Sequence, residues 1–320
     1  MTRHLRLGLA LFLLVPFAAD GQDPPPPGTD IHLLEIRPGD REVPDLSTPR
    51  NITDREGYDN QPFFLPSGGG LLYTSIRPLG SASDGDDGEA TQQADIMLYD
   101  PESGERRNLT ASPESEYSPT PIHGGKAFSV IRVGADGRQL LWSYAVDGQG
   151  DPKLLLPNVE PVGYHAWADS DSPEDLVLFV LGEPHSLQRV TIGGKAEAAK
   201  ARILAKDIGR SLHKIPGEDA FSFLHKTDDG WWIQRLSVDS DEITPLIRAF
   251  DGREDFAWSP SGKLWMADGS KLYRWCPMCG SRFQLVADLA EAGLRDITRL
   301  AVSPDGKQIA VVAERRVSDE

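Results

Sequence analysis

The feature that most constrains the fold is a repeated hairpin sequence. Near the end of the chain, AVSPDGKQIAVVAE (Ala301–Glu314) places a short apolar strand, a Ser-Pro-Asp-Gly turn and a second apolar strand in succession. Proline presets φ for a turn, and aspartate and glycine tolerate the left-handed backbone that a tight hairpin requires. A degraded copy, FAWSPSGKLWMA (Phe256–Ala267), has its turn 44 residues earlier. Two copies at this spacing predict an array of repeated units.

Similar hairpins recur through the chain. Two further short strands follow them, as in DIMLYDPESGERRNLT (Asp95–Thr110), so that one unit holds four strands, the size of a propeller blade. The turns are spaced by 57, 46, 47, 44 and 44 residues, at Pro66, His123, Asp169, Pro216, Pro260 and Pro304. The sequence therefore predicts an all-β fold, a six-bladed β-propeller of four-stranded blades.

The sixth unit contains only its first two strands. Near the other end of the chain, DIHLLEI (Asp30–Ile36) and RNIT (Arg50–Thr53) resemble the second half of a unit, because Asn-Leu-Thr also ends Asp95–Thr110. We expect these N-terminal strands to complete the last blade in a 2+2 closure, which leaves no open sheet edge. The propeller is thus expected to span residues 30–314, followed by a C-terminal tail at 315–320.

Two segments depart from the regular pattern. GGKAEAAKARILAKDI (Gly193–Ile208) has a helical composition, but its place in the repeat is that of an outer strand, and we predict a strand because tertiary context overrides propensity. The acidic sequence GSASDGDDGEATQQ (Gly80–Gln93) explains the long first spacing as an insertion between strands.

The N-terminal segment is typical of an exported protein. Arg3 and Arg6 precede the apolar run LGLALFLLVPFAA, which predicts a signal peptide at residues 1–21. A membrane anchor is the alternative, but a run of about 13 residues is shorter than the ~20 that span a bilayer. Residues 22–29 form a proline-rich linker.

The net charge of −16 argues against nucleic acid and anionic membrane surfaces as partners. We also expect no membrane insertion.

The units containing SPDGKQIAVV and SPSGKLWM, together with DIMLYDPESGERRNLT, resemble the TolB-type, WD40-like (PD40) propeller repeats of bacterial envelope proteins. The resemblance covers about residues 30–314 and is degenerate around Asp169 and Gly217. It implies six blades and a periplasmic or secreted location. Most TolB-like domains bind proteins, so it also implies a non-enzymatic scaffold for a protein or peptide partner. The repeat motif itself builds the scaffold, and function does not follow from it; no sequence signal indicates an oligomer, and a monomer is expected.

Residues that precede each innermost strand should converge at one mouth of the central channel. By the repeat register these are Gln61, Ser118, Tyr164, Ser211, Asp255 and Arg299, and the neighbouring His165 is included in the predicted site. Neighbouring positions add further candidates, namely Tyr58, Asp59, Glu116, Tyr117, His213, Glu254 and Asp296. Such a mixed polar ring suits a polar ligand or a loop of a partner. The alternative is a water-filled channel whose polarity is that of ordinary strand ends.

Catalysis has weaker support in the sequence. The ring lacks the several acids and the asparagine with which six-bladed lactonases hold a metal, and the chain has no G-x-S-x-G nucleophile elbow. We therefore predict no catalytic residue, no metal site and no cofactor. Two alternatives stay open: a channel-mouth lyase or hydrolase acting on a sugar or lactone, and an extracytoplasmic sensor or carbohydrate-binding module, for which the pair Trp231-Trp232 offers a stacking surface.

The two cysteines form a Cys-x-x-Cys motif, Cys276-Pro-Met-Cys279, at a turn between strands. In an oxidising compartment a local disulfide is the first interpretation. A redox-active pair would need a helix N-terminus, and a structural zinc would need further ligands, while free thiols are the remaining alternative.

The acidic turns at 84–89 and 169–175 lack the ligand spacing of a calcium loop. The sequons at Asn51 and Asn108 coincide with outer strands and are interpreted as structural.

Overall fold

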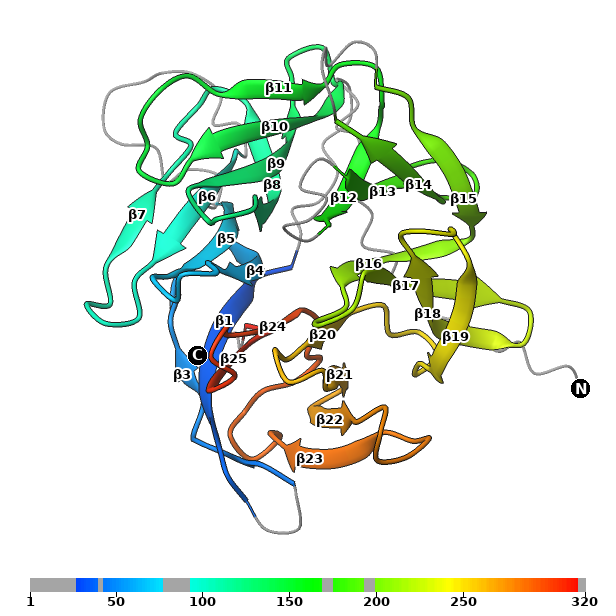
Figure 1. Ribbon diagram of the computed structural model, residues 1–320. Coiled ribbons are helices and arrows are strands. Elements are labelled where there is room, and N and C mark those ends of the chain that lie inside the picture. Colours follow the sequence, from blue (N-terminus) through cyan, green and yellow to red (C-terminus); the bar gives the residue numbers. More distant parts are fainter. Residues whose placement is uncertain (1–26, 40–42, 77–92, 169–174, 193–198, 316–320) are drawn as a thin grey trace, which may run out of the picture.

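The computed structural model describes residues 27–39, 43–76, 93–168, 175–192 and 199–315, and strands are the regular elements of these residues. The strands form six antiparallel blades arranged around a centre, each with four strands, and the short strand β2 (Asp45–Leu46) is an additional strand at the edge of the last blade (Figure 1). One parallel pairing, of Thr29 with Tyr58, links the last group to the first. The predicted all-β propeller with four-stranded blades is confirmed.

The first five blades follow the chain outward from the innermost strand. Blade 1 contains β4 (Tyr58–Phe64), β5 (Leu71–Ile76), β6 (Ala94–Tyr99) and β7 (Arg106–Asn108). Blade 2 contains β8 (Ser115–Pro121), β9 (Ala127–Val133), β10 (Gln139–Ala145) and β11 (Lys153–Leu156). Blade 3 contains β12 (Val162–Trp167), β13 (Asp175–Val180), β14 (Ser186–Thr191) and β15 (Arg202–Lys206). Blade 4 contains β16 (Ile208–Lys214), β17 (Ala220–Thr227), β18 (Gly230–Ser237) and β19 (Ile243–Arg248). Blade 5 contains β20 (Phe256–Trp258), β21 (Leu264–Asp268), β22 (Lys271–Trp275) and β23 (Gln284–Asp288).

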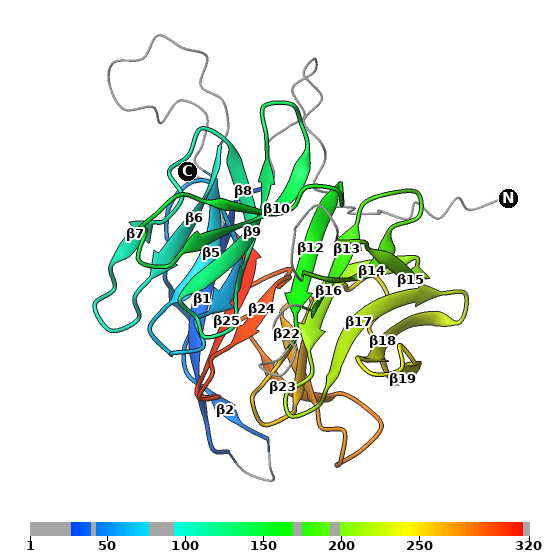
Figure 2. The ribbon, with the colours of Figure 1, turned by 45° about the horizontal axis from the view of Figure 1, so that its top comes forward.

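The sixth blade is built from both ends of the chain. Its inner strands are β24 (Leu300–Val302) and β25 (Gln308–Glu314), and its outer strands are β1 (Thr29–Arg37), with β3 (Arg50–Asn51) and β2 (Asp45–Leu46) on the far edge of β1. β1 runs antiparallel to β25 over seven residue pairs, from Thr29 opposite Glu314 to Glu35 opposite Gln308, and Figures 1 and 2 show the two side by side. The predicted 2+2 closure is confirmed.

Side chains of adjacent blades pack face to face and form the core. β5 (LLYTSI) and β13 (DLVLFV) are buried along their whole length, because a middle strand has a neighbouring blade on each side. β1 shows how alternation serves two interfaces. Ile31 and Leu33 join the cluster around Tyr73 of blade 1, whereas Leu34 joins the cluster around Trp265 of blade 5. The closing strand therefore contributes to both interfaces of the sixth blade.

The Ser-Pro-Asp-Gly turn is held by its own side chains. The Ser303 hydroxyl donates to Asp305 Oδ1 at 2.6 Å, and the Gly306 N–H donates to the Ser303 carbonyl at 2.9 Å. Gly306 has a φ of 71°, which an L side chain rarely adopts. In the earlier copy the Ser259 and Ser261 hydroxyls lie 3.0 Å apart, and the Gly262 N–H donates to the Ser259 carbonyl at 2.9 Å, in the corresponding positions. The repeat motif is thus a turn-forming device.

The Asn-x-Thr segments are a second structural repeat. Asn108 Nδ2 donates to Asp95 at 2.9 Å, and Asn108 Oδ1 accepts from the Thr110 N–H at 3.1 Å. In the sixth blade Asn51 makes the same bonds to Asp30 and Thr53, at 3.0 and 3.1 Å. Both asparagine side chains therefore take part in fixing the outer edge of a blade, as the structural interpretation of the sequons requires.

Replacing Asn108 by alanine should lower the free energy of unfolding by about 1–3 kcal/mol, because it leaves two partly buried partners without their hydrogen bonds. Urea denaturation followed by circular dichroism measures the change. Gln149→Ala, at an exposed loop position, is the control and should leave stability within about 0.5 kcal/mol. Equal stability of the Asn108 variant and the control would contradict the structural role.

The segment of helical composition contains the strand β15 at Arg202–Lys206, so the strand prediction is confirmed there. The signal peptide, most of the linker, the acidic insertion, the turn at Asp169 and most of the C-terminal tail lie outside the described residues. No helix of the described part of the chain is long and apolar enough to cross a membrane.

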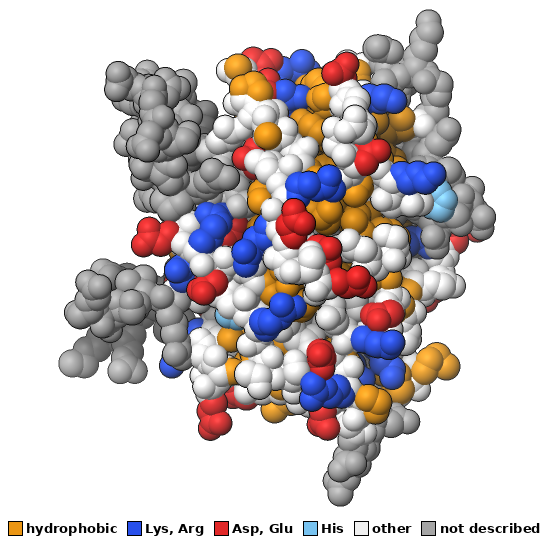
Figure 3. Space-filling model, turned by 90° about the vertical axis from the view of Figure 1, so that its left-hand side faces the viewer, with side chains coloured by type: hydrophobic (Ala, Val, Ile, Leu, Met, Phe, Trp, Pro, Cys, Tyr) orange, Lys and Arg blue, Asp and Glu red, His pale blue; other side chains and the backbone are white. Residues whose placement is uncertain are grey.

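On the face shown in Figure 3, positive and negative side chains are interspersed around a hydrophobic area. Acidic side chains are therefore not concentrated on this face.

Candidate functional site

The innermost strands of all six blades contribute to one pocket, with a volume of about 70 Å³. Every residue predicted for the channel mouth lines it: Gln61, Ser118, Tyr164, His165, Ser211, Asp255 and Arg299. Arg210 and His213 also line it. The other neighbours proposed from the sequence, namely Tyr58, Asp59, Glu116, Tyr117, Glu254 and Asp296, are not among its lining residues. The structure thus brings the seven residues predicted for the channel mouth together around one pocket.

Irregular backbone at the start of the inner strands shapes the pocket. The pairing register of β4, β8, β12 and β16 shifts at this point, as it does at a β-bulge, which re-aims side chains away from regular alternation. Gln61 and Ser118 both have a φ of 55°, which is uncommon for residues other than glycine. Gln61 Oε1 holds the pair together by accepting from the Ser118 N–H at 2.8 Å and from the Thr74 hydroxyl at 2.7 Å.

Two arginines share one carboxylate in this pocket. Arg210 Nε and Nη2 lie 3.0 and 2.5 Å from the two carboxylate oxygens of Asp255. Arg299 Nε lies 3.1 Å from Asp255 Oδ1. Arg299 Nη2 also donates to the Tyr164 hydroxyl at 2.8 Å, and its guanidinium carbon lies 4.8 Å from the centre of the tyrosine ring. The cluster therefore joins blades 3, 4, 5 and 6.

The charges of the cluster sum to one positive charge. Burial opposes ionisation of Asp255, but the positive charges of Arg210 and Arg299 outweigh it and lower the pKa of Asp255 to about 2. Burial likewise opposes the charge of Arg210, but Asp255 raises the pKa of the guanidinium above its usual value. Because arginine is cationic in proteins at neutral pH, the cluster contains two cations and one anion. In a chain of net charge −16 this pocket is locally positive and favours an anionic group.

The two histidines of the pocket are neutral at pH 7. Burial lowers the pKa of His165 to about 3 and that of His213 to about 4. His165 Nε2 lies 2.6 Å from the Ser129 hydroxyl, which also accepts from Trp167 Nε1 at 2.8 Å. Ser129 is fully buried, so this contact fixes the ring and offers no accessible nucleophile.

Stability should fall as the pH is lowered from 6.5 towards 4. A histidine whose pKa is depressed by folding stabilises the folded state above its unfolded pKa of 6.5, and that contribution is lost as the pH approaches the folded pKa. Each of the two histidines should therefore lower the free energy of unfolding by roughly 2–3 kcal/mol as the pH falls from 6.5 to about 4.5. Urea unfolding at several pH values measures the free energy of unfolding, which should depend less steeply on pH in His165→Leu than in the wild type. His123→Ala, at an exposed position, is the control. A pH dependence unchanged by His165→Leu would contradict a buried, neutral His165.

Arg210 is the residue that sequence reasoning missed. The register assigned Ser211 to the mouth, and strict alternation would turn its predecessor away. In β16 the pairing jumps from Ile208 opposite His225 to Leu212 opposite Phe223, and within this irregular stretch both Arg210 and Ser211 reach the pocket. The signal that could have found it is a cation immediately before the mouth position, with Asp255 at the mouth of the next blade.

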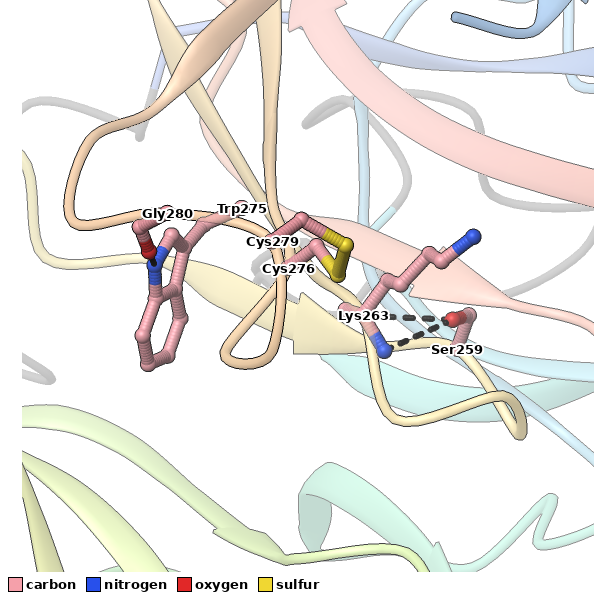
Figure 4. The surroundings of a disulfide bond; sticks show 6 residues. All are labelled: Ser259, Lys263, Trp275, Cys276, Cys279 and Gly280. Carbon is pink, nitrogen blue, oxygen red and sulfur yellow. Dashed lines mark hydrogen bonds between the residues drawn. A yellow bond between two sulfur atoms is a disulfide. The ribbon is translucent and has the colours of Figure 1, made fainter. Parts of the chain in front are cut away.

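The cysteines lie away from the pocket, on the connection between β22 and β23. Cys276 and Cys279 are joined by a disulfide across a turn whose Cys279 N–H donates to the Cys276 carbonyl at 3.0 Å (Figure 4). Trp275 Nε1 donates to the Gly280 carbonyl at 2.7 Å and so fixes the base of the same turn. The described residues contain no group of three or more His, Cys, Asp or Glu side chains arranged to hold a metal ion.

The tryptophan pair is only partly available as a stacking surface. Trp231 and Trp232 are both half-buried. The Lys226 ammonium lies 4.8 Å from the centre of a Trp231 ring, so that one face of this side chain is occupied. The acidic turn at 84–89 and most of the one at 169–175 lie outside the described residues.

Comparison with known proteins yields similarity at the level of structure. No protein-family model matches the sequence, and no curated protein matches it. A putative TolB from Agrobacterium tumefaciens is similar over 91% of this chain and 100% of its own, with a TM-score of 0.65 and 14% identity. A gluconolactonase from Xanthomonas campestris is similar over 91% and 99%, with a TM-score of 0.58 and 10% identity. TolB from Acinetobacter baumannii is similar over 90% of this chain and 64% of its own, with a TM-score of 0.51 and 11% identity. At these identities the likeness concerns the fold, and the chain has a TolB-like β-propeller fold.

Proposed function

We propose that this protein is an exported, non-enzymatic β-propeller scaffold of the bacterial envelope, periplasmic or secreted, that binds a protein or peptide at its channel mouth. The observation that carries the proposal is the pocket to which all six blades contribute, with its Arg210–Asp255–Arg299 cluster. Structural similarity to two TolB proteins is consistent with a scaffold, although it shows the fold alone.

The chemistry of the pocket favours binding over catalysis. General acid–base catalysis is most efficient when a side chain has a pKa near the operating pH. The pKa values of Asp255, His213 and His165 are instead lowered to about 2, 4 and 3. Asp255 is the one acid among the described lining residues, and Arg210 and Arg299 engage its oxygens. This donor set suits recognition of a polar group better than the metal-dependent opening of a lactone.

The small volume of the pocket also favours binding of a partner over catalysis on a sugar or lactone. Pockets that enclose a small molecule typically measure about 300–1,000 Å³, whereas this one measures about 70 Å³. A single side chain or chain end of a partner fits such a space, while a sugar ring would be largely exposed.

The proposal keeps the domain organisation expected from the sequence: a signal peptide at 1–21, a linker at 22–29, the propeller at 30–314 and a tail at 315–320. The protein would act as a monomer without a cofactor.

Affinity capture from native envelope extract of the source cells tests this function. The tagged wild-type protein should reproducibly enrich a protein partner, and Arg299→Gln should reduce the recovery at least tenfold. Arg248→Gln is the matched control, since Arg248 belongs to an exposed ion pair outside the pocket, and it should leave recovery unchanged. Failure of the wild type to enrich a partner, or equal recovery with Arg299→Gln, would contradict the proposal.

A further inference from the structure

We propose that the channel mouth recognises a single carboxylate group, supplied by a chain end or an acidic side chain of the partner, and that Arg210 and Arg299 bind it. This inference rests on the proposed binding function and names the chemistry of the ligand. It follows from the charge, the free donors and the size of the pocket.

The charge of the cluster matches one carboxylate. Arg210 and Arg299 carry two positive charges and Asp255 one negative charge, which leaves one positive charge uncompensated. A carboxylate neutralises it. A phosphate ester carries about −1.5 to −2 at neutral pH and would leave the pocket negative. The charge balance therefore selects a monoanion.

The anion of the cluster is more deeply buried than its two cations. The Asp255 side chain is 6% exposed, whereas those of Arg210 and Arg299 are 17% and 14% exposed. The shared carboxylate is thus the most deeply buried member of the cluster. It holds both guanidiniums in place as a positioning residue, so that an arriving ligand meets arginines that are already oriented.

Both arginines retain unused donors. Arg210 bonds Asp255 through Nε and Nη2, and Arg299 uses Nε for Asp255 and Nη2 for Tyr164. Among the described residues, neither Nη1 has a hydrogen-bond partner, and neither is among the atoms sealed from solvent without one. Each Nη1 is therefore accessible to solvent and has free N–H donors, on two residues that line the pocket. Paired planar donors match the two oxygens of a carboxylate, which makes arginine the usual residue for this recognition.

The size and rim of the pocket restrict what is attached to the carboxylate. A volume of about 70 Å³ is enough for a few water molecules and for the carboxylate that displaces them. Pro62, Phe63 and Pro119 line the same pocket, and Phe63 is 36% exposed. These apolar side chains would contact the aliphatic part of a residue or the chain next to its carboxylate. A peptide carboxylate fits this combination of a cationic base and an apolar rim.

Titration with acetate tests the inference on the intact mature protein. In ¹⁵N-labelled protein at constant ionic strength, acetate should produce saturable shifts of the Nε–Hε signals of Arg210 and Arg299. Acetamide, which has the same shape without the charge, should bind at least tenfold more weakly, and so should inorganic phosphate. Equal effects of acetate and acetamide, an unsaturable response, or phosphate binding as tight as that of acetate would overturn the proposal.

Variants and peptides sharpen the result. Arg299→Gln should weaken acetate binding at least tenfold, Arg299→Lys should weaken it less, and Arg248→Gln should not affect it. Acetyl-Ala-Ala-Ala with a free C-terminus and acetyl-Ala-Glu-Ala-amide distinguish the two sources of the carboxylate, and binding of either supports the inference. Binding of both no tighter than that of acetyl-Ala-Ala-Ala-amide would overturn it.

The two proposals fail in different ways. If the protein captures a partner in an Arg299-dependent manner but does not respond to acetate, the scaffold function stands and carboxylate recognition is rejected. If it binds acetate specifically but captures no protein partner, the carboxylate site stands and the scaffold function is rejected.

Discussion

Deleting Thr29–Arg37 should abolish the cooperative unfolding transition of the whole propeller. This segment forms β1, which pairs with β25 over seven residues and closes the ring. Without it the sixth blade would lose its outer strands, β25 would become an exposed edge, and Ile31, Leu33 and Leu34 would leave two inter-blade cores. Thermal unfolding followed by circular dichroism measures the effect, and the deletion variant should show no transition or one at a much lower temperature.

Point variants separate the role of packing from that of chain length. Ile31 is fully buried, and Ile31→Ala should lower the free energy of unfolding by about 2–5 kcal/mol. Glu35→Ala, in the same strand with an exposed side chain, should change it by no more than about 0.5 kcal/mol. A deletion variant that unfolds like the wild type would show that β1 is a dispensable tail and would contradict the closure.

Asp255→Ala should destabilise the protein by about 3–5 kcal/mol, because it leaves the partly buried guanidiniums of Arg210 and Arg299 next to each other without their shared counterion. Urea denaturation at pH 7 measures the loss. Asp251→Ala removes an exposed partner of Arg248, whose ion pair is worth about 0–1 kcal/mol, and serves as the control. Equal effects of the two substitutions would contradict a buried, jointly held carboxylate.

The Asp255 carboxylate also gives stability a pH dependence. The folded-state pKa of Asp255 is lowered from 3.8 to about 2, so the stability that its ionised form provides is present above pH 3.8 and is lost as the pH falls towards 2. Asp255→Asn lacks this dependence. The difference in unfolding free energy between wild type and Asp255→Asn should therefore shrink below pH 3.8, and a constant difference over this range would contradict the assignment.

The repeat made most of the fold predictable. Ser-Pro-Asp-Gly at 303–306 and its copy at 259–262 encode a turn through local hydrogen bonds, so their spacing reports the blade period directly. The partner of the last half-unit could be identified because Asn51 and Asn108 make the same bonds in corresponding strands. Local propensity was the poorer guide: residues 193–208 have a helical composition, but Arg202–Lys206 within them forms β15, because pairing with β14 outweighs a preference of a few tenths of a kcal/mol per residue.

The pocket was predictable in position but not in chemistry. Counting from each turn located Asp255 and Arg299 at the same mouth, because the blades repeat with nearly constant geometry. The pairing of both arginines with Asp255 could not be read from the sequence, since it depends on the irregular register of β16 that brings Arg210 into the pocket. Bulges break the two-residue alternation on which such counting relies.

Crosslinking from the channel mouth tests partner binding at the pocket. A photoreactive p-benzoylphenylalanine placed at Phe63, on the rim of the pocket, should crosslink one discrete protein or peptide in native envelope extract. The same probe at Leu285, which is 50% exposed on the outer strand β23, should give no such adduct. Loss of the Phe63 adduct in the Arg299→Gln background is the predicted result. Equal crosslinking at both positions, or none at Phe63, would contradict a partner-binding site at the mouth of the propeller.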